Sequence, residues 1–323
     1  MAVVALLSLA LHHPFPPAPR RALVHSLARG FGSPAPPSSP TPTLDADAAA
    51  LLEEARGDVD RARTNYVGYT LAFLQDADPE LYAKLKQDPS RPECHEALVE
   101  LTWDAIAAFL PVTHSPTPTP AAARKLTAIA RAACDGSAAA PRVLDVGCGN
   151  GLLLPFLVAS GMGAAEYRGV DLSSRMIDAA TKAHGRLGAR FEAVSFSKAC
   201  EGEERYDAVV FNGALQFFAD VEGTLAQAAS VLATDATARI VISHLNGAEF
   251  VRKEAKDNPT TVRSTMPSLE TLEVVASGLG LQVVIPSFFG SEVQEIEKGL
   301  EDFYLVVLRR VGDNDDNERV EHD

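Results

Sequence analysis

The sequence predicts an α/β fold, with a mostly parallel sheet of seven strands that helices cover on both faces. From residue 121 onward, short apolar segments alternate with segments of helical periodicity, as in a parallel sheet with helical crossovers. Residues 44–110 show helical periodicity alone and predict an N-terminal helical lobe. Residues 111–120 contain four prolines, which predict an extended linker that excludes a helix.

The expected sheet domain covers residues 121–310. Its strands are expected at Arg142–Val146, Tyr167–Asp171, Arg190–Ser195, Tyr206–Phe211, Arg239–His244, Leu281–Ile285 and Phe303–Leu308. Its helices are expected at Ala121–Cys134, Gly151–Ser160, Ser173–Leu187 and Val221–Leu232. The acidic segment between the last two strands is too short for a clear helical crossover, which predicts a final antiparallel pair.

Three helical segments are expected in the lobe, at Leu44–Arg63, Asn65–Lys86 and Glu93–Leu110. Asp45 and Asp47 fall in the first turn of the first segment, where carboxylates suit the positive end of a helix. The third segment carries apolar residues that are expected to share one face, namely Leu98, Leu101, Ile106 and Phe109.

The two ends of the chain have compositions that do not build a core. Residues 1–43 contain no acidic residue but three arginines, several serines and a dense Pro/Ala stretch, which is typical of a plastid transit peptide. A mitochondrial leader, a secretory signal built on the apolar run Ala2–Leu11, and a retained cytosolic tail are the alternatives. Residues 311–323 are acidic and are expected to be disordered.

Composition excludes several classes of function. A formal charge of −14 argues against a surface for phosphate backbones, so no nucleic-acid partner is expected. No apolar run reaches the ~18–20 residues that span a bilayer. The four cysteines are scattered without metal-ligand spacing, so we expect reduced thiols and no metal site.

A glycine-rich loop follows the first expected strand and opens a helix. It reads Asp145-Val146-Gly147-Cys148-Gly149-Asn150-Gly151. Its glycines let the backbone turn sharply and approach a ligand. A dinucleotide loop presents helix amides to a pyrophosphate. Asp145 would repel a pyrophosphate and suits a ligand that carries an ammonium and a sulfonium.

A second acid ends the next expected strand. Asp171 stands in the segment Gly169-Val170-Asp171-Leu172-Ser173, 20 residues beyond Gly151. An acid at this place accepts hydrogen bonds from both ribose hydroxyls in nucleoside-binding α/β folds. The two acids, in order and at strand ends, therefore indicate a nucleoside ligand with positive charge.

Together these motifs resemble the class I S-adenosylmethionine (SAM) dependent methyltransferases, over residues 121–310. The resemblance implies a Rossmann-like sheet of seven strands with the last one antiparallel, and SAM as cosubstrate. It places the methionine part of SAM against the loop, its ribose on Asp171, and its adenine between Leu172 and Met176. The implied cofactor-binding residues are Asp145, Gly147, Gly149, Asn150, Gly151, Asp171, Leu172, Ser195, Phe196 and Asn212.

Two departures narrow the resemblance. Many members have an acid after the third strand for the adenine amino group, whereas Ser195 stands here, so its hydroxyl and the Phe196 amide would serve. The fourth-strand motif has Gln216 where small-molecule members often have histidine, and it lacks the Asn/Asp-Pro-Pro-aromatic tetrad of amide- and nucleobase-methylating enzymes. The segment Asn258–Pro267 resembles an uncharacterised plant and algal branch of the superfamily.

Several residues are candidates for the methyl acceptor's side. His244 ends the fifth strand, where it would serve either as a general base or as a tie for the following loop. Tyr66, Tyr69 and Trp103 are candidates for a substrate lid, although such spacing is more typical of core packing.

The sequence thus predicts methyl transfer from SAM to a small molecule by in-line displacement. Two alternatives stay open at this point. One is a methyltransferase-fold protein that binds or assembles without catalysis, which the departures at Ser195 and Gln216 favour. The other is a nicotinamide-dependent oxidoreductase, which the charge of Asp145 disfavours. The oligomeric state is not indicated.

Overall fold

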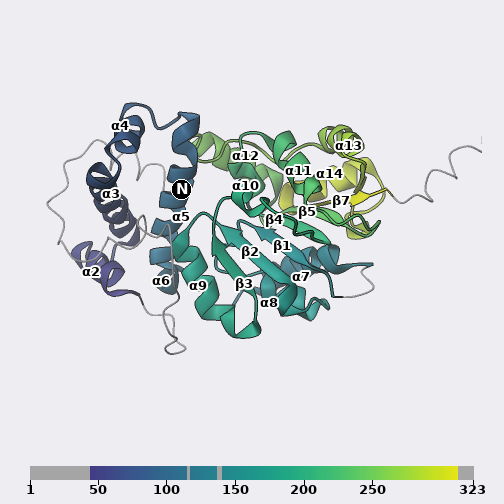
Figure 1. Ribbon diagram of the computed structural model, residues 1–323, viewed down its shortest axis with the longest axis horizontal. Helices are drawn as coiled ribbons and strands as arrows, with labels where there is room; N and C mark the ends of the chain where they lie inside the picture. The colour runs from purple at the N-terminus through teal and green to yellow at the C-terminus, as the bar shows by residue number, and fades with distance from the viewer. Residues whose placement is uncertain (1–43, 115–116, 137–139, 312–323) are drawn as a thin grey trace, which may run out of the picture.

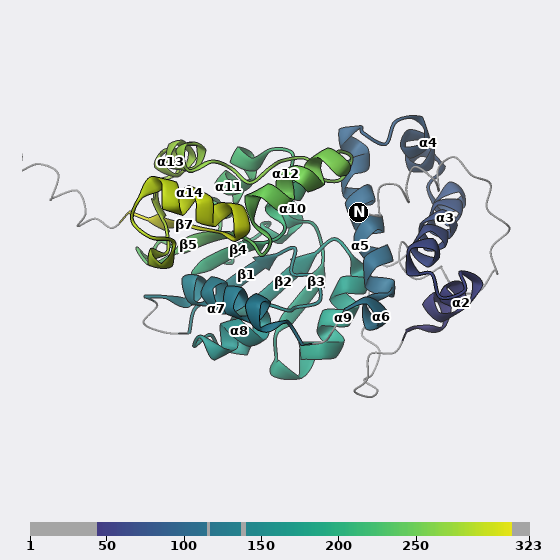
Figure 2. The same cartoon turned by 180° about the vertical axis from the view of Figure 1, so that it is seen from behind.

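The structure is a computed structural model that describes residues 44–114, 117–136 and 140–311. The predicted transit peptide (1–43) and nearly all of the acidic tail (312–323) lie outside the described residues. Figures 1 and 2 show a central sheet with helices on both faces, and a helical lobe beside it.

One sheet of seven strands forms the centre of the molecule, in the order β3-β2-β1-β4-β5-β7-β6 (Figure 1). Its strands are β1 (Val143–Val146), β2 (Tyr167–Asp171), β3 (Arg190–Ala193), β4 (Ala208–Asn212), β5 (Arg239–His244), β6 (Leu281–Val284) and β7 (Tyr304–Arg310). Strands β1 to β5 pair in parallel, whereas β7 runs antiparallel to β5 and to β6. The predicted Rossmann-like sheet with a final antiparallel pair is confirmed.

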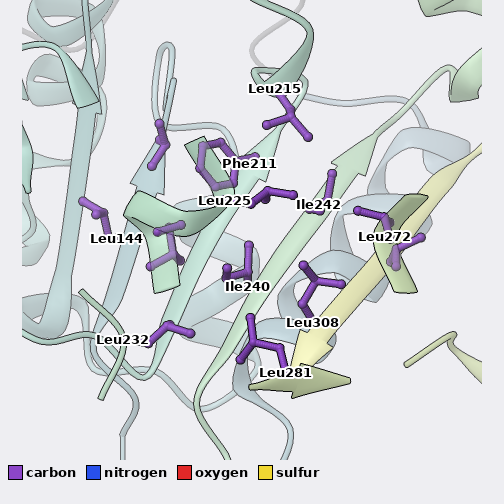
Figure 3. Close-up of a cluster of buried hydrophobic side chains, with 14 of the residues drawn as sticks. Leu144, Phe211, Leu215, Leu225, Leu232, Ile240, Ile242, Leu272, Leu281 and Leu308 are labelled. Carbon is purple, nitrogen blue, oxygen red and sulfur yellow. The ribbon is translucent and has the colours of Figure 1, made fainter. Parts of the chain in front are cut away.

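Helices cover the sheet because its strands are apolar toward both faces. In β4, Val209 and Phe211 face one core cluster, while Ala208 and Val210 face the other. Helices α7 (Pro120–Cys134) and α8 (Leu154–Ala159) pack on the second face. Helices α10 (Phe196–Ala199), α11 (Val221–Ser230) and α13 (Leu269–Gly278) pack on the first, where leucines and isoleucines fill the space (Figure 3).

The remaining helices of this domain are α9 (Ser174–His184), α12 (Gly247–Asp257) and α14 (Val293–Asp302). The expectation that the acidic segment before β7 has no helix is wrong, because α14 occupies it. Ile296 and Leu300 lie four residues apart and face the core, while most of the acidic side chains stay exposed. Short 3₁₀ turns connect several elements: η3 (Ala164–Glu166), η4 (Gly185–Leu187), η5 (Leu215–Phe217) and η6 (Ser287–Phe289).

The lobe contains α2 (Ala46–Glu54), α3 (Val59–Ala77), α4 (Pro79–Gln87), η2 (Pro92–Cys94), α5 (His95–Ala108) and α6 (Leu110–Thr113). The single helix expected over 44–63 is wrong. Arg56 and Gly57 adopt φ of 55° and 82°, which ends α2, and Asp58 caps α3. The exclusion of a helix from 111–120 is also wrong for α6, because a proline is tolerated in the first turn.

The lobe has a hydrophobic core of its own. Leu98, Leu101 and Phe109 belong to it, whereas Ile106, expected on the same face, does not. The two core clusters of the sheet domain contain no lobe residue among the described residues. Contact between the two regions runs mainly through α5, which packs against α9.

Candidate active site

The cavity that matters lies where the strand order reverses. Strand β1 has β2 on one side and β4 on the other, and the carboxyl ends of the three strands meet at one edge. Open α/β sheets bind ligands in the crevice outside this edge. A cavity of about 410 Å³ lies there, lined by the loops after β1 to β4 on one side and by α5 and α6 on the other.

The loop after β1 forms the floor of this cavity. Gly147 and Gly149 have φ of 67° and 53°, the left-handed region that disfavours other residues. A Cβ on Gly147 would lie 2.6 Å from the Cβ of Ala214, so this loop passes close to the loop after β4. A Cβ on Gly149 would meet open space. Gly147, Gly149 and Asn150 line the cavity, as expected.

Asp145 lies at the deepest point of the loop. Its side chain lines the cavity but is only 1 % exposed, and the hydroxyl of Tyr167 donates a hydrogen bond to it at 2.8 Å. The pKa of Asp145 is raised to about 7, mainly by burial; the Tyr167 hydrogen bond lowers it and the charge of Asp171 raises it. A bound cation would offset this cost of burial, which suits the predicted charge of the ligand.

Asp171 lies beside it at the end of β2. One carboxylate oxygen accepts from the Gly149 amide at 2.9 Å and the other from the Ser173 amide at 2.8 Å. Each oxygen keeps a lone pair for a ligand hydroxyl. Burial raises the pKa of Asp171 to about 6, against the two amide hydrogen bonds. Leu172 and Met176 line the cavity next to this carboxylate, where the resemblance places an adenine.

The predicted adenine contacts also line the cavity. Ser195 caps α10, its hydroxyl accepting from the Lys198 amide at 3.3 Å. Phe196 is the first residue of α10, so its amide has no partner inside that helix. Asn212 lines the cavity from the end of β4, and its side-chain oxygen accepts from Ser243 at 3.2 Å.

Two predicted site residues lie elsewhere. Gly151 does not line the cavity, and a Cβ there would lie 2.8 Å from the His184 ring, so this glycine permits close packing behind the loop. His244 does not line it either. Its Nδ1 accepts from the Asn246 amide at 3.2 Å and its ring stacks on Phe250. These contacts match the loop tie that was weighed against a general base.

Helix α5 forms the opposite wall of the cavity. Of the three aromatic lid candidates, Trp103 lines the cavity and meets the Phe217 ring edge to face, with centroids 5.7 Å apart. Tyr66 and Tyr69 are buried in the lobe core instead.

Two polar contacts fasten α5 across the cavity mouth. Near its carboxyl end, Asp104 is 3 % exposed and accepts from the hydroxyl of Ser173 at 2.6 Å, beside the Asp171 loop. At its amino end, His95 contacts the Phe217 carbonyl at 2.5 Å. A carbonyl only accepts, so Nε2 of His95 is the donor to Phe217, while Nδ1 lies 3.3 Å from both Nε of Arg263 and the Thr260 carbonyl.

Sequence reasoning did not find most of this wall. The missed lining residues are His95, Glu96, Val99, Ile106, Leu110 and His114. The available signal was the second apolar stripe of α5, in which Val99, Trp103 and Ile106 recur at helical spacing. A helix that is apolar on two faces buries both of them. One face of α5 packs in the lobe core, and the other lines the cavity.

The four cysteines are free thiols. Within residues 44–114, 117–136 and 140–311, no group of three or more potential ligands is placed to hold a metal ion. In the same ranges, no helix is both long and apolar enough to cross a bilayer.

Comparison with known families supports the assignment that the loop geometry indicates. Residues 143–235 match the family model described as a methyltransferase domain. This match assigns residues 143–235, the first part of the sheet region, to a methyltransferase domain. The paired carboxylates, the open space at Gly149 and the apolar flank of Asp171 fit SAM, the cosubstrate that the sequence predicts.

Several solved methyltransferase structures are similar to this chain at low sequence identity. One is magnesium protoporphyrin IX methyltransferase from Synechocystis PCC 6803 with bound SAH (14% identity, TM-score 0.48, covering 67% of this chain and 100% of that one). Another is the CcbJ methyltransferase from Streptomyces caelestis (17% identity, TM-score 0.46, covering 64% and 96%). Comparison with curated protein sequences returned no significant match.

Proposed function

We propose that the protein transfers the methyl group of SAM to a small molecule held between the glycine-rich loop and α5. The observation that carries this proposal is one continuous cavity that joins the two carboxylates, Asp145 and Asp171, to the wall formed by the lobe. A cosubstrate on the carboxylates would leave the lobe side for the methyl acceptor.

SAM brings an electrophilic methyl carbon on a sulfonium, and in-line displacement forms the bond to the acceptor as the carbon–sulfur bond breaks, releasing S-adenosylhomocysteine. The chain's own residues bind and orient. Asp171 would hold the ribose, while Gly149 and Asp145 would hold the methionine part. Helix α5 closes the cavity against water, so that positioning lowers the barrier.

Charge disfavours the oxidoreductase alternative. Among the described residues that line the cavity there is no lysine or arginine, while Glu96, Asp145 and Asp171 are carboxylic acids. A nicotinamide cofactor would place a pyrophosphate among these groups.

The proposal is tested by calorimetric titration with S-adenosylhomocysteine, followed by assays for its release from SAM with fractionated leaf or algal metabolites. Asp171→Ala should weaken binding about 100-fold, because two ribose hydrogen bonds to a charged group are lost. Asp178→Ala on the exposed face of α9 is the matched control and should bind normally. Equal binding by both variants would sink the proposal, and binding without product release would favour the non-catalytic alternative.

The proposed setting is a plastid of a plant or alga. The acid-free, arginine-bearing composition of residues 1–43 and the resemblance of Asn258–Pro267 support it. A fluorescent protein fused behind residues 1–43 should enter plastids, and a diffuse cytosolic signal would contradict this setting.

A further inference from the structure

The lobe side of the cavity has a mostly apolar lining that suits an apolar ligand. Its lining from α5 and α6 is formed by Val99, Trp103, Ile106 and Leu110. Across from them, Phe217 and Phe218 line the opposite wall, and Phe217 meets Trp103 edge to face. Aromatic and aliphatic walls of this kind bind apolar rings through buried area and ring contacts.

His114 adds a polar group whose character follows from its neighbour. The hydroxyl of Thr113 donates to the Phe109 carbonyl at 2.9 Å, because a carbonyl only accepts. The same hydroxyl lies 2.8 Å from Nδ1 of His114, so this nitrogen must be the donor of that bond. The hydrogen of a neutral ring then sits on Nδ1, and Nε2 keeps a lone pair. His114 therefore offers a hydrogen-bond acceptor at the cavity.

The one charged side chain of the described lobe residues that line the cavity, Glu96, is also an acceptor. Glu96 lines the cavity from an exposed position at the first turn of α5. The remaining polar lining group of α5, His95, is already bonded to the Phe217 carbonyl and to Arg263. Apart from the indole N–H of Trp103, the lobe side chains that line the described cavity thus present lone pairs and negative charge.

We propose that the methyl acceptor is an apolar, ring-bearing molecule with a hydroxyl or amine hydrogen and no carboxylate or phosphate. This inference rests on the proposed function and names the substrate class of the same site. The acceptor's ring packs on Trp103 and its donor group faces His114 or Glu96. An anionic acceptor meets Glu96 with no lining cation to offset the repulsion.

The test uses three probes that share a biphenyl frame: para-phenylphenol, para-phenylbenzylamine and para-phenylbenzoate. Each is titrated by calorimetry at neutral pH into the protein saturated with S-adenosylhomocysteine. Trp103 is the single tryptophan of the chain, so a change in its emission shows that a probe binds in this cavity. We expect the phenol and the amine to bind and to change the emission, and the benzoate to bind at least ~10-fold more weakly.

Two variants identify the groups responsible. Glu96→Lys should raise the affinity for the benzoate about 10-fold, whereas Glu53→Lys, at an exposed position of α2 outside the cavity, should leave it unchanged. His114→Phe should weaken the phenol about 5-fold while the Trp103 response remains.

Benzoate binding as tightly as the phenol, binding without a change in Trp103 emission, or no binding by any probe would overturn the inference. The preceding titration with S-adenosylhomocysteine tests the proposed function separately. If that titration fails, the proposed function falls first, and the probes are then titrated into the protein alone to judge the character of the cavity.

Discussion

The sheet domain and the helical lobe contribute to one cavity in different ways. The sheet side consists of loops whose backbone is held by the strand ends, as when Asp171 accepts from the amides of Gly149 and Ser173. The lobe side consists of side chains on one helix, α5, which approaches from outside. The cosubstrate half is thus fixed by backbone geometry, and the acceptor half by the choice of side chains.

The two regions also differ in how they are held. Each has its own hydrophobic core, and α5 is fastened at both ends by polar contacts, Asp104 with Ser173 and His95 with Phe217. A lobe held in this way can change its lining without disturbing the sheet. The contact of Asp104 with Ser173 also couples the α5 wall to the loop after β2, because Ser173 contacts both Asp104 and Asp171.

The largest expected effect comes from breaking that coupling. Asp104→Ala leaves the buried hydroxyl of Ser173 without its acceptor, which should lower the free energy of unfolding by about 1–3 kcal/mol. Affinity for S-adenosylhomocysteine should fall about 10-fold, because the Asp171 loop loses its support. Calorimetric titration and thermal unfolding measure the two quantities.

Two further variants separate this contact from lobe docking in general. Asp104→Asn keeps an acceptor oxygen and should retain most of the affinity. Asp45→Ala removes the ion pair with Arg175, which is partly exposed, and should cost less than about 1 kcal/mol. An Asp104→Ala protein with unchanged affinity would show that the lobe and the loop after β2 are independent.

The contrast between the sheet domain and the lobe also explains which features can be predicted from the sequence. Strand order, the antiparallel end and the two acids follow from local patterns, because a strand end places its next residue at a known edge. Strand bounds fall within two residues of prediction, and most of the loop residues line the cavity as expected. Gly151 is the loop residue that does not line the cavity. It has a positive φ and packs closely against His184, and the sequence alone does not distinguish a glycine needed for packing from one needed for ligand approach.

The lobe was predicted less well for a physical reason. An apolar stripe on a helix signals burial but not the partner that buries it, so Ile106 was expected on one face with Leu98, Leu101 and Phe109 although it lines the cavity. The break at Arg56 and Gly57 was missed because a single turn interrupts an otherwise helical pattern. Asp104 acts through a contact with the distant Ser173 and His114 through a contact with its neighbour Thr113, and no spacing rule reveals either one.

The next expected effect is a pH dependence of the affinity for SAM, which arises from the two carboxylates on the sheet side of the cavity. Burial raises the pKa of Asp145 to about 7 and that of Asp171 to about 6 in the free protein. A cationic cosubstrate favours the ionised carboxylates, so binding releases protons and affinity should rise as pH increases. Between pH 7 and 6 the affinity for SAM should fall by up to about 10-fold per unit, below pH 6 more steeply because Asp171 also binds a proton, and above pH 7 the affinity should level off.

Tyr167→Phe sharpens this prediction. It removes the hydrogen bond that lowers the pKa of Asp145, so the rise in affinity should move to higher pH. Tyr69→Phe, in the lobe core, is the matched control and should leave the profile in place. Titrations between pH 5 and 9 measure both, and a flat wild-type profile would mean that Asp145 is ionised throughout.

The smallest expected effect is that of replacing His244, which ends β5 outside the cavity. This variant tests whether His244 acts as a general base. Burial and the charge of Lys125 lower the pKa of His244 to about 4, and its Nδ1 already accepts from Asn246. His244→Ala should therefore cost about 1 kcal/mol of stability and leave the affinity for S-adenosylhomocysteine unchanged. If His244→Ala removed a pKa from the pH–rate profile, His244 would be a general base after all. Proton transfer from the acceptor would then have to reach His244 past Gly213, which lies next to its ring.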